Sequence, residues 1–437
     1  MTELSDIPEE VLRIIFLKLD GTTLFRMGQV CKYWYRIVYE LTQDVSMWCS
    51  FCLYEIPTPA LEQMTGLVDV DNLLECDSRM RDKILSVRLP WQYWREVYIA
   101  YCRSRCLRQW HCLRRTVKQS KFRGKPTCVK FHGNLLLTGH ENGSVICWEN
   151  AGMKHQTNSL LHRHRSAVTA LAVLDFSNLK NGKTTSFTII SGSDDRELLY
   201  TTYRSEHRMT RCLSHSTIVT SISSWGSNFV TGNQDTILHG QWVFTLTPDF
   251  NIVRCFHLLG HGSSNITATC LWKNKVASGD DEGNIYIWEL TETHKRYLLP
   301  FNVLSTSGPV QQIVLCGDRL LCLSGKHTLS VYSNDKCCVE KNIFHDLTRT
   351  PEYISLWGPI LAIGVKAGIV YIYRLETDKD WINIDLTAPL YILHSGQEHV
   401  LSLDITDSGL GPSLAFATDN NTIHLAHWLP QHSKRVR

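Results

Sequence analysis

Cysteine and histidine could hold a metal ion in this chain, and two segments bring them close together in the sequence. Two residues separate Cys49 from Cys52, and a tighter group consists of Cys102, Cys106, His111 and Cys112. A structural zinc site usually presents two close ligand pairs with regular spacing. The spacing here is irregular and both segments have a helical pattern. We therefore interpret them as free thiols and predict no metal site.

The motifs that mark common catalytic sites do not occur in a credible context. The sequence has no phosphate-binding P-loop, HExxH, nucleophile elbow or dinucleotide fingerprint. The 19 histidines are scattered, and His162 and His164 flank Arg163 in a segment that we interpret as a solvated or binding loop. The sequence therefore predicts a protein that is not an enzyme and needs no cofactor.

Charge and hydropathy argue against further classes. The net charge is only +3, which disfavours a dedicated nucleic-acid binder. Many bases and only two acids lie from Arg79 to Lys125, and we interpret them as a solvated helix face beside an acidic partner rather than a nucleic-acid surface. There is no run of 18 apolar residues for a membrane span and no signal-peptide pattern at the start. The 16 cysteines are then expected to be reduced, in the cytoplasm or the nucleus.

Residues 4–50 have the pattern of a small helical unit. Pro8, followed by Glu9 and Glu10, is typical of a helix start. Apolar residues follow at helical spacing, first Val11, Leu12, Ile15, Phe16 and Leu19, and then Leu24, Met27, Val30, Cys31, Trp34, Ile37, Val38 and Leu41. About three short helices cannot bury this much apolar surface internally, so part of it should meet a partner.

This unit resembles the F-box. It keeps the residues and spacing of that motif in IPEEVL from Ile7, in Ile15-Phe16, in Leu19-Asp20, in VCKYW from Val30, and in Trp48. Ile7 departs mildly from the motif, in which leucine is commoner. The resemblance implies an F-box at residues 1–50 that binds a Skp-type adaptor through Ile7, Pro8, Leu12, Ile15, Phe16, Leu19, Leu24, Val30, Cys31 and Trp34.

Residues 51–115 form a bridge to the rest of the chain. Pro57 and Pro59 break the chain, and a later segment has the pattern of an amphipathic helix whose apolar side carries Trp91, Trp94, Val97, Tyr98 and Tyr101. It resembles the aromatic connecting helix of F-box/WD-repeat proteins. The resemblance implies a helical linker that sets the distance and angle between the adaptor and the second domain.

Residues 116–437 change to a strand pattern that recurs seven times. Each recurrence contains β-rich runs separated by Gly, Asn or Asp turns, and the recurrences end at Trp148, Tyr203, Trp242, Trp288, Tyr332, Tyr373 and Trp428. The period matches the 40 to 45 residues of a four-stranded propeller blade. The sequence predicts an α+β multidomain protein: an all-α F-box and helical linker, then an all-β seven-bladed, WD-like β-propeller. We expect an early strand to close the ring by pairing with the last blade.

One repeat resembles the WD repeat most closely. Gly260-His261 opens it, Ser278-Gly279 lies in its second strand, and Trp288 closes it. In WD repeats a His, a Ser or Thr, a turn Asp and the Trp form hydrogen bonds within the blade. Glu282 stands where the turn Asp is usual, whereas Asp195 keeps that acid in the second repeat. We interpret these residues as structural rather than as a catalytic triad.

The resemblance to the F-box/WD-repeat family implies a function. Its members are substrate-recognition subunits of SCF-type ubiquitin ligases, in which the adaptor holds a cullin and a RING subunit while the propeller binds the target protein. This sequence has no RING pattern of its own. The alternative is a propeller scaffold whose F-box contact with the adaptor serves a role other than degradation.

The target is expected to bind one face of the propeller. The turns between second and third strands and the loops entering each blade lie on one face of a WD propeller, and their candidate substrate-binding bases are Arg163, Arg165, Arg196, Arg349, Lys326 and Lys366. Guanidinium groups bind phosphate well, but acids such as Asp194, Asp281 and Glu282 share these turns. The sequence leaves open a phosphorylated substrate, an unmodified peptide or a folded surface.

Overall fold

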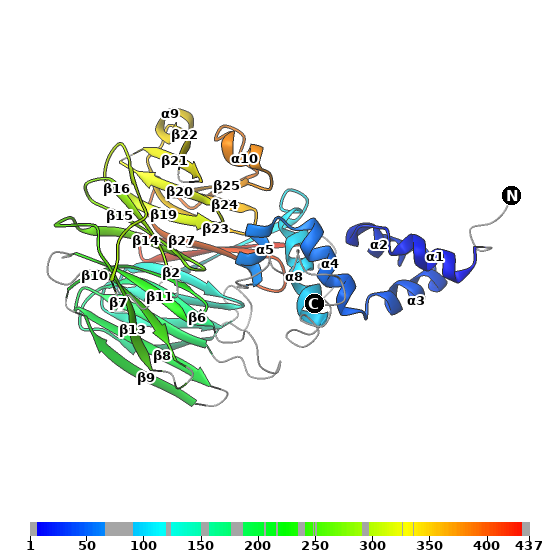
Figure 1. Cartoon of the computed structure of the whole chain (residues 1–437), viewed down its shortest axis with the longest axis horizontal. Helices are drawn as coiled ribbons and strands as arrows, with labels where there is room; N and C mark the ends of the chain where they lie inside the picture. The colour runs from blue at the N-terminus through cyan, green and yellow to red at the C-terminus, as the bar shows by residue number, and fades with distance from the viewer. Residues whose placement is uncertain are drawn as a thin grey trace. The chain divides into compact units, whose positions relative to one another are not determined.

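The structure is a computed structural model of the chain (Figure 1). It describes residues 7–65, 91–118, 124–149, 157–175, 187–204, 207–215, 217–234, 241–247, 249, 251–290, 297–325, 327–334 and 336–430. These residues divide into two compact units, one ending at Arg105 and one starting at Cys106, and each is described by itself. Lys326, one of the predicted substrate-binding bases, lies outside the described residues. Within the described ranges, no helix is long and apolar enough to cross a membrane.

The first unit is helical throughout its described length. Its helices are α1 (Glu9–Phe16), α2 (Gly21–Met27), α3 (Lys32–Leu41), α4 (Val45–Glu55), α5 (Thr58–Thr65) and α8 (Trp91–Ser104). The predicted start after Pro8 is confirmed, with both acids in the first turn of α1. The Asp20 carboxylate accepts the Thr23 N–H at 2.9 Å and caps α2. Hydrogen bonds from the Thr22 and Thr23 hydroxyls, more than this cap, lower the pKa of Asp20 to about 2. Such caps explain why the helices begin where they do.

One core joins the F-box segment to the predicted linker helix. The predicted apolar side of α8 is confirmed, since Trp94, Val97, Tyr98 and Tyr101 are buried together with Trp48 of α4. Glu55 at the end of α4 connects two further helices: it accepts the Gly21 N–H at 2.9 Å and the Tyr98 hydroxyl at 2.6 Å. A Cβ at position 21 would lie 2.5 Å from the Tyr98 ring, so only glycine fits there. The two predicted segments therefore fold as one unit.

The second unit contains seven antiparallel sheets of four main strands each, the blades of a β-propeller. In chain order they are β2 (Pro126–His132), β3 (Leu135–His140), β4 (Ser144–Glu149) and β5 (Thr157–Arg163); β6 (Val168–Asp175), β7 (Phe187–Ser193), β8 (Glu197–Arg204) and β9 (His207–Ser214); β10 (Val219–Trp225), β11 (Asn228–Asn233), β12 (Gln241–Leu246) and β13 (Ile252–Leu258); β14 (Ile266–Trp272), β15 (Lys275–Asp280), β16 (Asn284–Glu289) and β18 (Asn302–Ser305); β19 (Val310–Cys316), β20 (Arg319–Ser324), β21 (Thr328–Ser333) and β22 (Lys336–Asn342); β23 (Pro351–Trp357), β24 (Ile360–Val365), β25 (Ile369–Arg374) and β26 (Tyr391–His394); and β27 (Val400–Asp407), β28 (Pro412–Thr418), β29 (Thr422–Leu429) and β1 (His111–Lys118).

Three short elements complete the unit: β17 (Tyr297–Leu298) joins the third sheet, α9 (Ile343–Leu347) precedes the sixth blade, and α10 (Asp378–Ile382) lies between β25 and β26. The predicted seven-fold recurrence is confirmed. Each aromatic residue that ended a predicted repeat lies in the third strand of its blade. Neighbouring first strands contact one another around the ring, from β2 to β6 and finally from β27 back to β2.

The ring closes as predicted, by an early strand. β1 pairs antiparallel with β29 along its whole length, from His111 opposite Leu429 to Lys118 opposite Thr422. This strand begins at His111, within the segment assigned to the linker from the sequence. The helical pattern expected through Cys112 is therefore wrong: α8 ends at Ser104, and Cys112 lies in a strand. The third-strand Trp428 of this last blade needs β1 as its outer neighbour.

A repeated threonine links successive blades. Thr127, Thr169, Thr220 and Thr267 each occupy the second position of a first strand. Each hydroxyl donates a hydrogen bond of 2.5 to 2.6 Å to the first carbonyl of the next blade's first strand. One such bond contributes about 1 kcal/mol net. Together the threonines fix the rotation between neighbouring blades over half of the ring.

Asp404 joins the blades where the ring closes. Its carboxylate accepts the Phe131 N–H at 2.8 Å and the Ser355 hydroxyl at 3.1 Å, and it lies 3.1 Å from the Lys130 ammonium. Burial opposes the charge of that ammonium, but the charge of Asp404 raises the pKa of Lys130 overall. One buried carboxylate thus connects the last blade to the first and to the sixth.

Replacing Asp404 by alanine should destabilise the whole propeller. The substitution leaves the buried Phe131 N–H without its acceptor and removes the contacts of the carboxylate with Ser355 and with the partly exposed Lys130, so we expect a loss of about 2 kcal/mol or more in the free energy of unfolding. Urea unfolding of the full chain measures it. Asp318→Ala, at an exposed residue, is the control and should change stability by about 0.5 kcal/mol or less. A wild-type midpoint for Asp404→Ala would contradict this account of closure.

Candidate protein-binding surfaces

The outward sides of α1 and α3 present apolar side chains to solvent. We call this set the apolar helix surface; it comprises Val11, Ile14, Ile15, Leu17, Val30, Tyr35 and Tyr39. The rings of Tyr35 and Tyr39 stack with their centroids 6.2 Å apart. Because the helices also have a filled core of their own, these residues are surplus to internal packing. Such a patch on a small domain marks a site of protein contact.

The predicted adaptor-binding residues divide between this surface and the core. Pro8, Ile15, Val30 and Cys31 are exposed, and Ile7, Leu19 and Trp34 are half-buried, whereas Leu12, Phe16 and Leu24 are buried. The Phe16 ring meets the Trp34 ring edge-on at 5.3 Å. The buried residues therefore hold the helices in place, and the exposed ones are available for contact.

The predicted adaptor-binding set missed five residues of this surface, namely Val11, Ile14, Leu17, Tyr35 and Tyr39. The signal was present, because apolar residues occur on more than one side of α1. Helical spacing shows that a face is apolar, but it does not tell which of two such faces meets the core.

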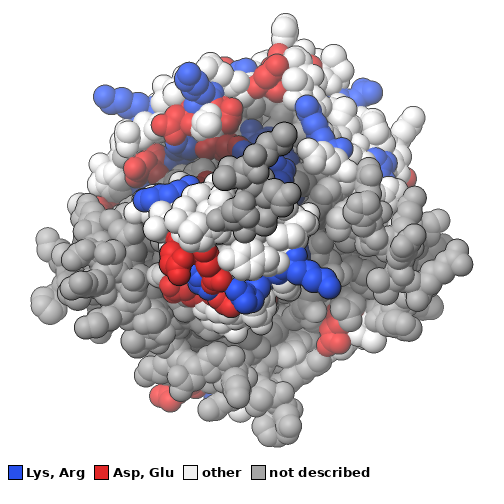
Figure 2. Space-filling model, turned by 90° about the vertical axis from the view of Figure 1, so that its right-hand side faces the viewer, with Lys and Arg blue, Asp and Glu red and all other residues white. Residues whose placement is uncertain are grey.

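Four charged side chains connect α1 to α3 beside this surface. Arg13 contacts both Glu9 and Glu40, and Arg36 lies 2.6 Å from Glu9. The hydrogen bond from Arg13 lowers the pKa of Glu9, against the opposing effect of burial. Figure 2 likewise shows acidic and basic side chains next to one another on the face that it presents. Exposed pairs of this kind add little stability, but they orient the two helices.

In the propeller, one recurring hydrogen bond defines what we call the turn face. The first residue after each second strand donates its backbone N–H to the carbonyl of the residue before the first strand. The donors are Glu141, Asp194, Gln234, Asp281, Gly325, Lys366 and Asp419, at 2.8 to 3.3 Å. The expectation that these turns share a face with the blade-entry loops is confirmed. Four of the seven positions carry a carboxylate.

The predicted substrate-binding bases on this face form two separate sets, and all those within the described residues are exposed. Arg163, Arg165 and Arg196 lie together at the first and second blades, where Asp195 accepts the Arg165 N–H at 2.8 Å. Arg349 and Lys366 lie at the sixth blade, where the Lys366 N–H reaches the Thr350 carbonyl. Three blades separate the two sets in one direction around the ring, and one blade, the seventh, separates them in the other, so these bases are not gathered at one point of the ring.

The fourth blade contains the hydrogen-bonded histidine expected from its sequence. His261 Nε2 lies 2.5 Å from Ser278 Oγ, and Nδ1 lies 3.1 Å from Asp280. The prediction of Glu282 as the turn acid is wrong, since Glu282 is exposed. Asp280 is the acid that contacts His261 instead. Its other carboxylate oxygen accepts the backbone N–H groups of Glu282 and Asn284, which holds the carboxylate in place across the tight turn.

Two buried histidines lie around one serine of the second blade: His162 comes from β5 of the first blade, and His164 from the loop that follows it. His164 Nδ1 lies 3.1 Å from Asp195, and its Nε2 lies 2.7 Å from Ser191 Oγ. His162 Nε2 approaches the same Oγ at 2.6 Å, and its Nδ1 lies 2.7 Å from Thr201. The interpretation of a solvated loop here is therefore wrong. Burial, together with the neighbouring His164, lowers the pKa of His162 to about 3.

These His-Ser-Asp groups have the contacts of a catalytic triad without access for a substrate. Ser191 and Ser278 have no exposed surface at all. A nucleophile must reach the reacting carbon, so neither serine can act as one in this fold. Both groups join the segment that enters a blade to the second strand of that blade, in keeping with the structural role expected from the sequence.

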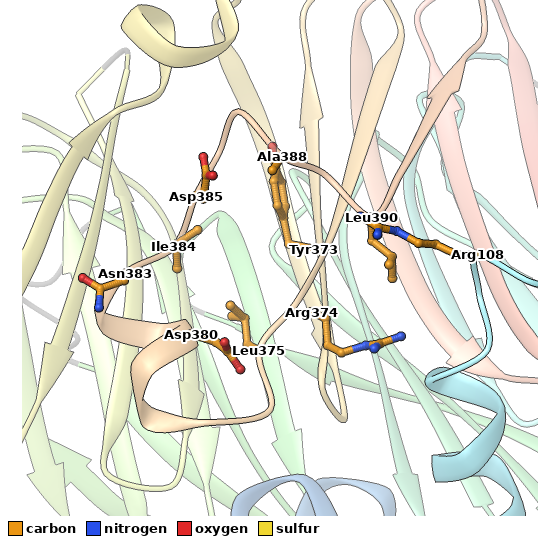
Figure 3. Close-up of a pocket in the computed structure, with 10 residues that line it drawn as sticks. All are labelled: Arg108, Tyr373, Arg374, Leu375, Asp380, Asn383, Ile384, Asp385, Ala388 and Leu390. Atoms are coloured by element: carbon orange, nitrogen blue, oxygen red, sulfur yellow. The ribbon is translucent and has the colours of Figure 1, made fainter.

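The propeller also has a small surface cavity of about 220 Å³ beside α10 (Figure 3). Figure 3 shows Arg108 and Arg374 on one side of the cavity and the α10 segment on the other. Its carboxylates serve the fold: Asp380 accepts the Thr377 N–H at 2.7 Å, and Asp385 accepts the Thr387 N–H at 2.9 Å. In the part of the chain that the structure describes, no three His, Cys, Asp or Glu side chains meet as metal ligands.

The buried histidines should make the stability of the propeller fall in mild acid. An unfolded histidine binds a proton near pH 6.5, but folded His162 does so only near pH 3. The unfolded state thus binds more protons between these values, and stability is full above pH 6.5 and declines below it. Below pH 6.5 we expect His162 to lower the free energy of unfolding by about 1.4 kcal/mol for each pH unit.

Unfolding free energies of the full chain at pH 7 and pH 5 test this expectation. His162→Gln should show a smaller decline than wild type, whereas His345→Gln, whose side chain is 87% exposed, should show the wild-type decline. Equal declines in all three proteins would rule out the buried neutral state of His162.

Comparisons with known proteins agree with this architecture. The family model described as F-box-like matches residues 4–54. No curated protein matches the sequence significantly. The crystal structure of the β-propeller domain of Cps50 (Swd1) from Myceliophteria thermophila is similar in fold, with a TM-score of 0.53, 15% identity, and coverage of 72% of this chain and 99% of that one. The computationally designed Ika8 protein matches at 16% identity and a TM-score of 0.45, over 70% of this chain and 96% of that one.

These findings establish the organisation of the chain. N-terminal helices carry an F-box-like domain, and an all-β propeller of seven blades follows. F-box domains generally bind Skp-type adaptors, and propellers offer a broad face for protein contact. The organisation therefore fits an F-box/propeller protein.

Proposed function

We propose that this chain is the substrate-recognition subunit of an SCF-type ubiquitin ligase. The observation that carries the proposal is the apolar helix surface, which lies within the segment that matches the F-box-like family at residues 4–54. Its exposed side chains lie outside a core that is already filled by Leu12, Phe16 and Leu24. A Skp-type adaptor is the partner that would cover them.

In this proposal, the chain organises ubiquitin transfer without performing any chemistry itself. The adaptor connects it to a cullin and a RING subunit, in the cytoplasm or the nucleus. The propeller holds the target so that its lysines have a high effective concentration near the ubiquitin thioester. The repeated WD-like hydrogen bonds keep the turn face rigid, which favours precise positioning of the target.

We further propose that the turn face binds an unmodified protein surface that carries both signs of charge. Its described bases lie in two separate sets, and four of its seven equivalent turn positions are carboxylates. A phosphorylated segment would meet repulsion from Asp194, Asp281 and their equivalents as well as attraction from the arginines. A surface with alternating charge could pair with both.

Charged substitutions on the apolar helix surface should abolish adaptor binding. Ile14→Glu with Leu17→Glu places two charges where the adaptor would bury apolar groups, and we expect a loss of about 2 kcal/mol or more, at least thirtyfold in affinity. Calorimetry with a purified Skp-type adaptor and the full chain measures it. Leu160→Glu, at an exposed apolar residue of the propeller, should bind like wild type.

The Ile14→Glu/Leu17→Glu variant must melt at the wild-type temperature, which shows that the loss of adaptor binding is not caused by unfolding. By contrast, Leu12→Ala with Phe16→Ala should first destabilise the helical unit, by about 2 to 5 kcal/mol for each residue. Undiminished adaptor affinity of the folded double glutamate variant would refute the F-box role.

Proteins that bind the turn face should be retained after dephosphorylation. We expect partners that co-purify with the full chain to bind equally well after phosphatase treatment of the lysate. The Arg163→Ala/Arg196→Ala variant should retain more of these partners than the Asp194→Lys/Asp281→Lys variant. Loss of the same partners on phosphatase treatment and in the arginine variant would establish the phosphate-dependent alternative instead. Partners whose half-life is unchanged when the cullin is inhibited would point to a scaffold rather than to a ligase subunit.

A further inference from the structure

The segment from β17 to β18 exposes four apolar side chains. Tyr297, Leu299, Phe301 and Val303 are 63%, 75%, 52% and 47% exposed. They alternate with more buried residues such as Leu298, although residues 299–301, between the two strands, are not strand themselves. The usual pattern of apolar side chains inward and polar side chains outward is reversed here. We call these four residues the apolar edge.

Two outer strands of other blades differ from it. The exposed residues of β22 are Lys336, Cys337, Cys338, Glu340 and Asn342. Those of β1 include His111 and Arg114. Charged and polar side chains at a sheet edge prevent it from pairing with other chains. The apolar edge carries no charge at its four outward positions, so it lacks this protection.

The apolar edge also spans two blades. β17 continues the third sheet in parallel, with Tyr297 opposite His257, whereas β18 continues the fourth sheet, with Val303 opposite Tyr286. Both are the last strands of their sheets. The Tyr297 ring contacts His257 at 5.4 Å, and the Lys275 ammonium lies over the Phe301 ring at 5.7 Å. Neighbouring strands therefore hold these side chains in a fixed arrangement.

The exposed apolar area is of the size that a stable interface uses. Given the usual areas of such side chains, the four residues expose about 400 Å². A standard interface covers about 800 Å² on each partner, of which somewhat more than half is apolar, or about 450 Å². A patch of about 400 Å² is as large as the largest patch on a typical single chain, and such patches often have a function.

We propose that the apolar edge binds the same edge of a second copy of this chain across a twofold axis. A twofold axis places the same patch of each copy against the other, so that apolar side chains meet apolar side chains. The strands beside it carry both signs of charge, with Lys275 directly opposite Glu289 in register. A twofold axis can then pair unlike charges. The proposal does not depend on the adaptor or the ligase role.

Sedimentation velocity of the full chain between about 1 and 50 μM tests the proposal. Wild type should shift from the mass of one chain to that of two as the concentration rises. Leu299→Asp with Phe301→Asp should weaken this association about a hundredfold or more, because each charge would be buried against apolar groups. Leu160→Asp is the matched control, at another exposed apolar residue of an outer strand, and should associate like wild type.

A second measurement locates the contact. Val303→Cys should form a disulfide-linked dimer under mild oxidation, and Leu160→Cys should not. Wild type that remains a single chain at 50 μM would overturn the proposal. Association that persists in the Leu299→Asp/Phe301→Asp variant, with its fold intact by melting, would overturn it as well, since the contact would then lie elsewhere.

Discussion

The propeller depends on one pairing, that of β1 with β29. In the last blade the chain supplies the outer strand from residues that precede the first blade, and Cys112 of that strand lies opposite Trp428. Without it, the last sheet would end in an open edge beside Trp428, and Asp404 would lose the geometry that connects three blades. The paired residues lie more than 300 positions apart in the chain, so one loop-closure entropy covers the entire ring.

Closure has a consequence for the turn face. Because the threonine hydroxyls and Asp404 fix the rotation between blades, the two sets of bases are held at a constant separation. Arginines on a flexible face could move together around one anion, but arginines held by a rigid ring cannot. The charge pattern of the ligand must therefore match that of the ring, which is why a broad mixed surface is a better fit than a single modified side chain.

Repeated features of the fold were predictable from the sequence, and unrepeated ones were not. The aromatic residues at each third strand recur with the period of a blade, and the apolar side of α8 follows from helical spacing. The acid beside His261 was misassigned because a two-residue shift within a turn depends on which backbone N–H groups the carboxylate can reach. Leu12 and Ile14 look alike in a helical pattern, and only packing separates them. The apolar edge escaped notice because β17 leaves its own blade for the neighbouring one, which no repeat pattern reveals.

The shared serine of the second blade gives its hydrogen bonds a direction. Ionised Asp195 can only accept, so His164 must carry its proton on Nδ1, and its Nε2 must then accept the single proton of Ser191. His162 can therefore only donate from Nε2, and its Nδ1 accepts from the Thr201 hydroxyl. Each group from Thr201 to His164 therefore donates its hydrogen bond in the same direction, toward the turn face. A further proton on the His162 or the His164 ring would place two donors opposite each other. These hydrogen bonds therefore allow only one arrangement of protons.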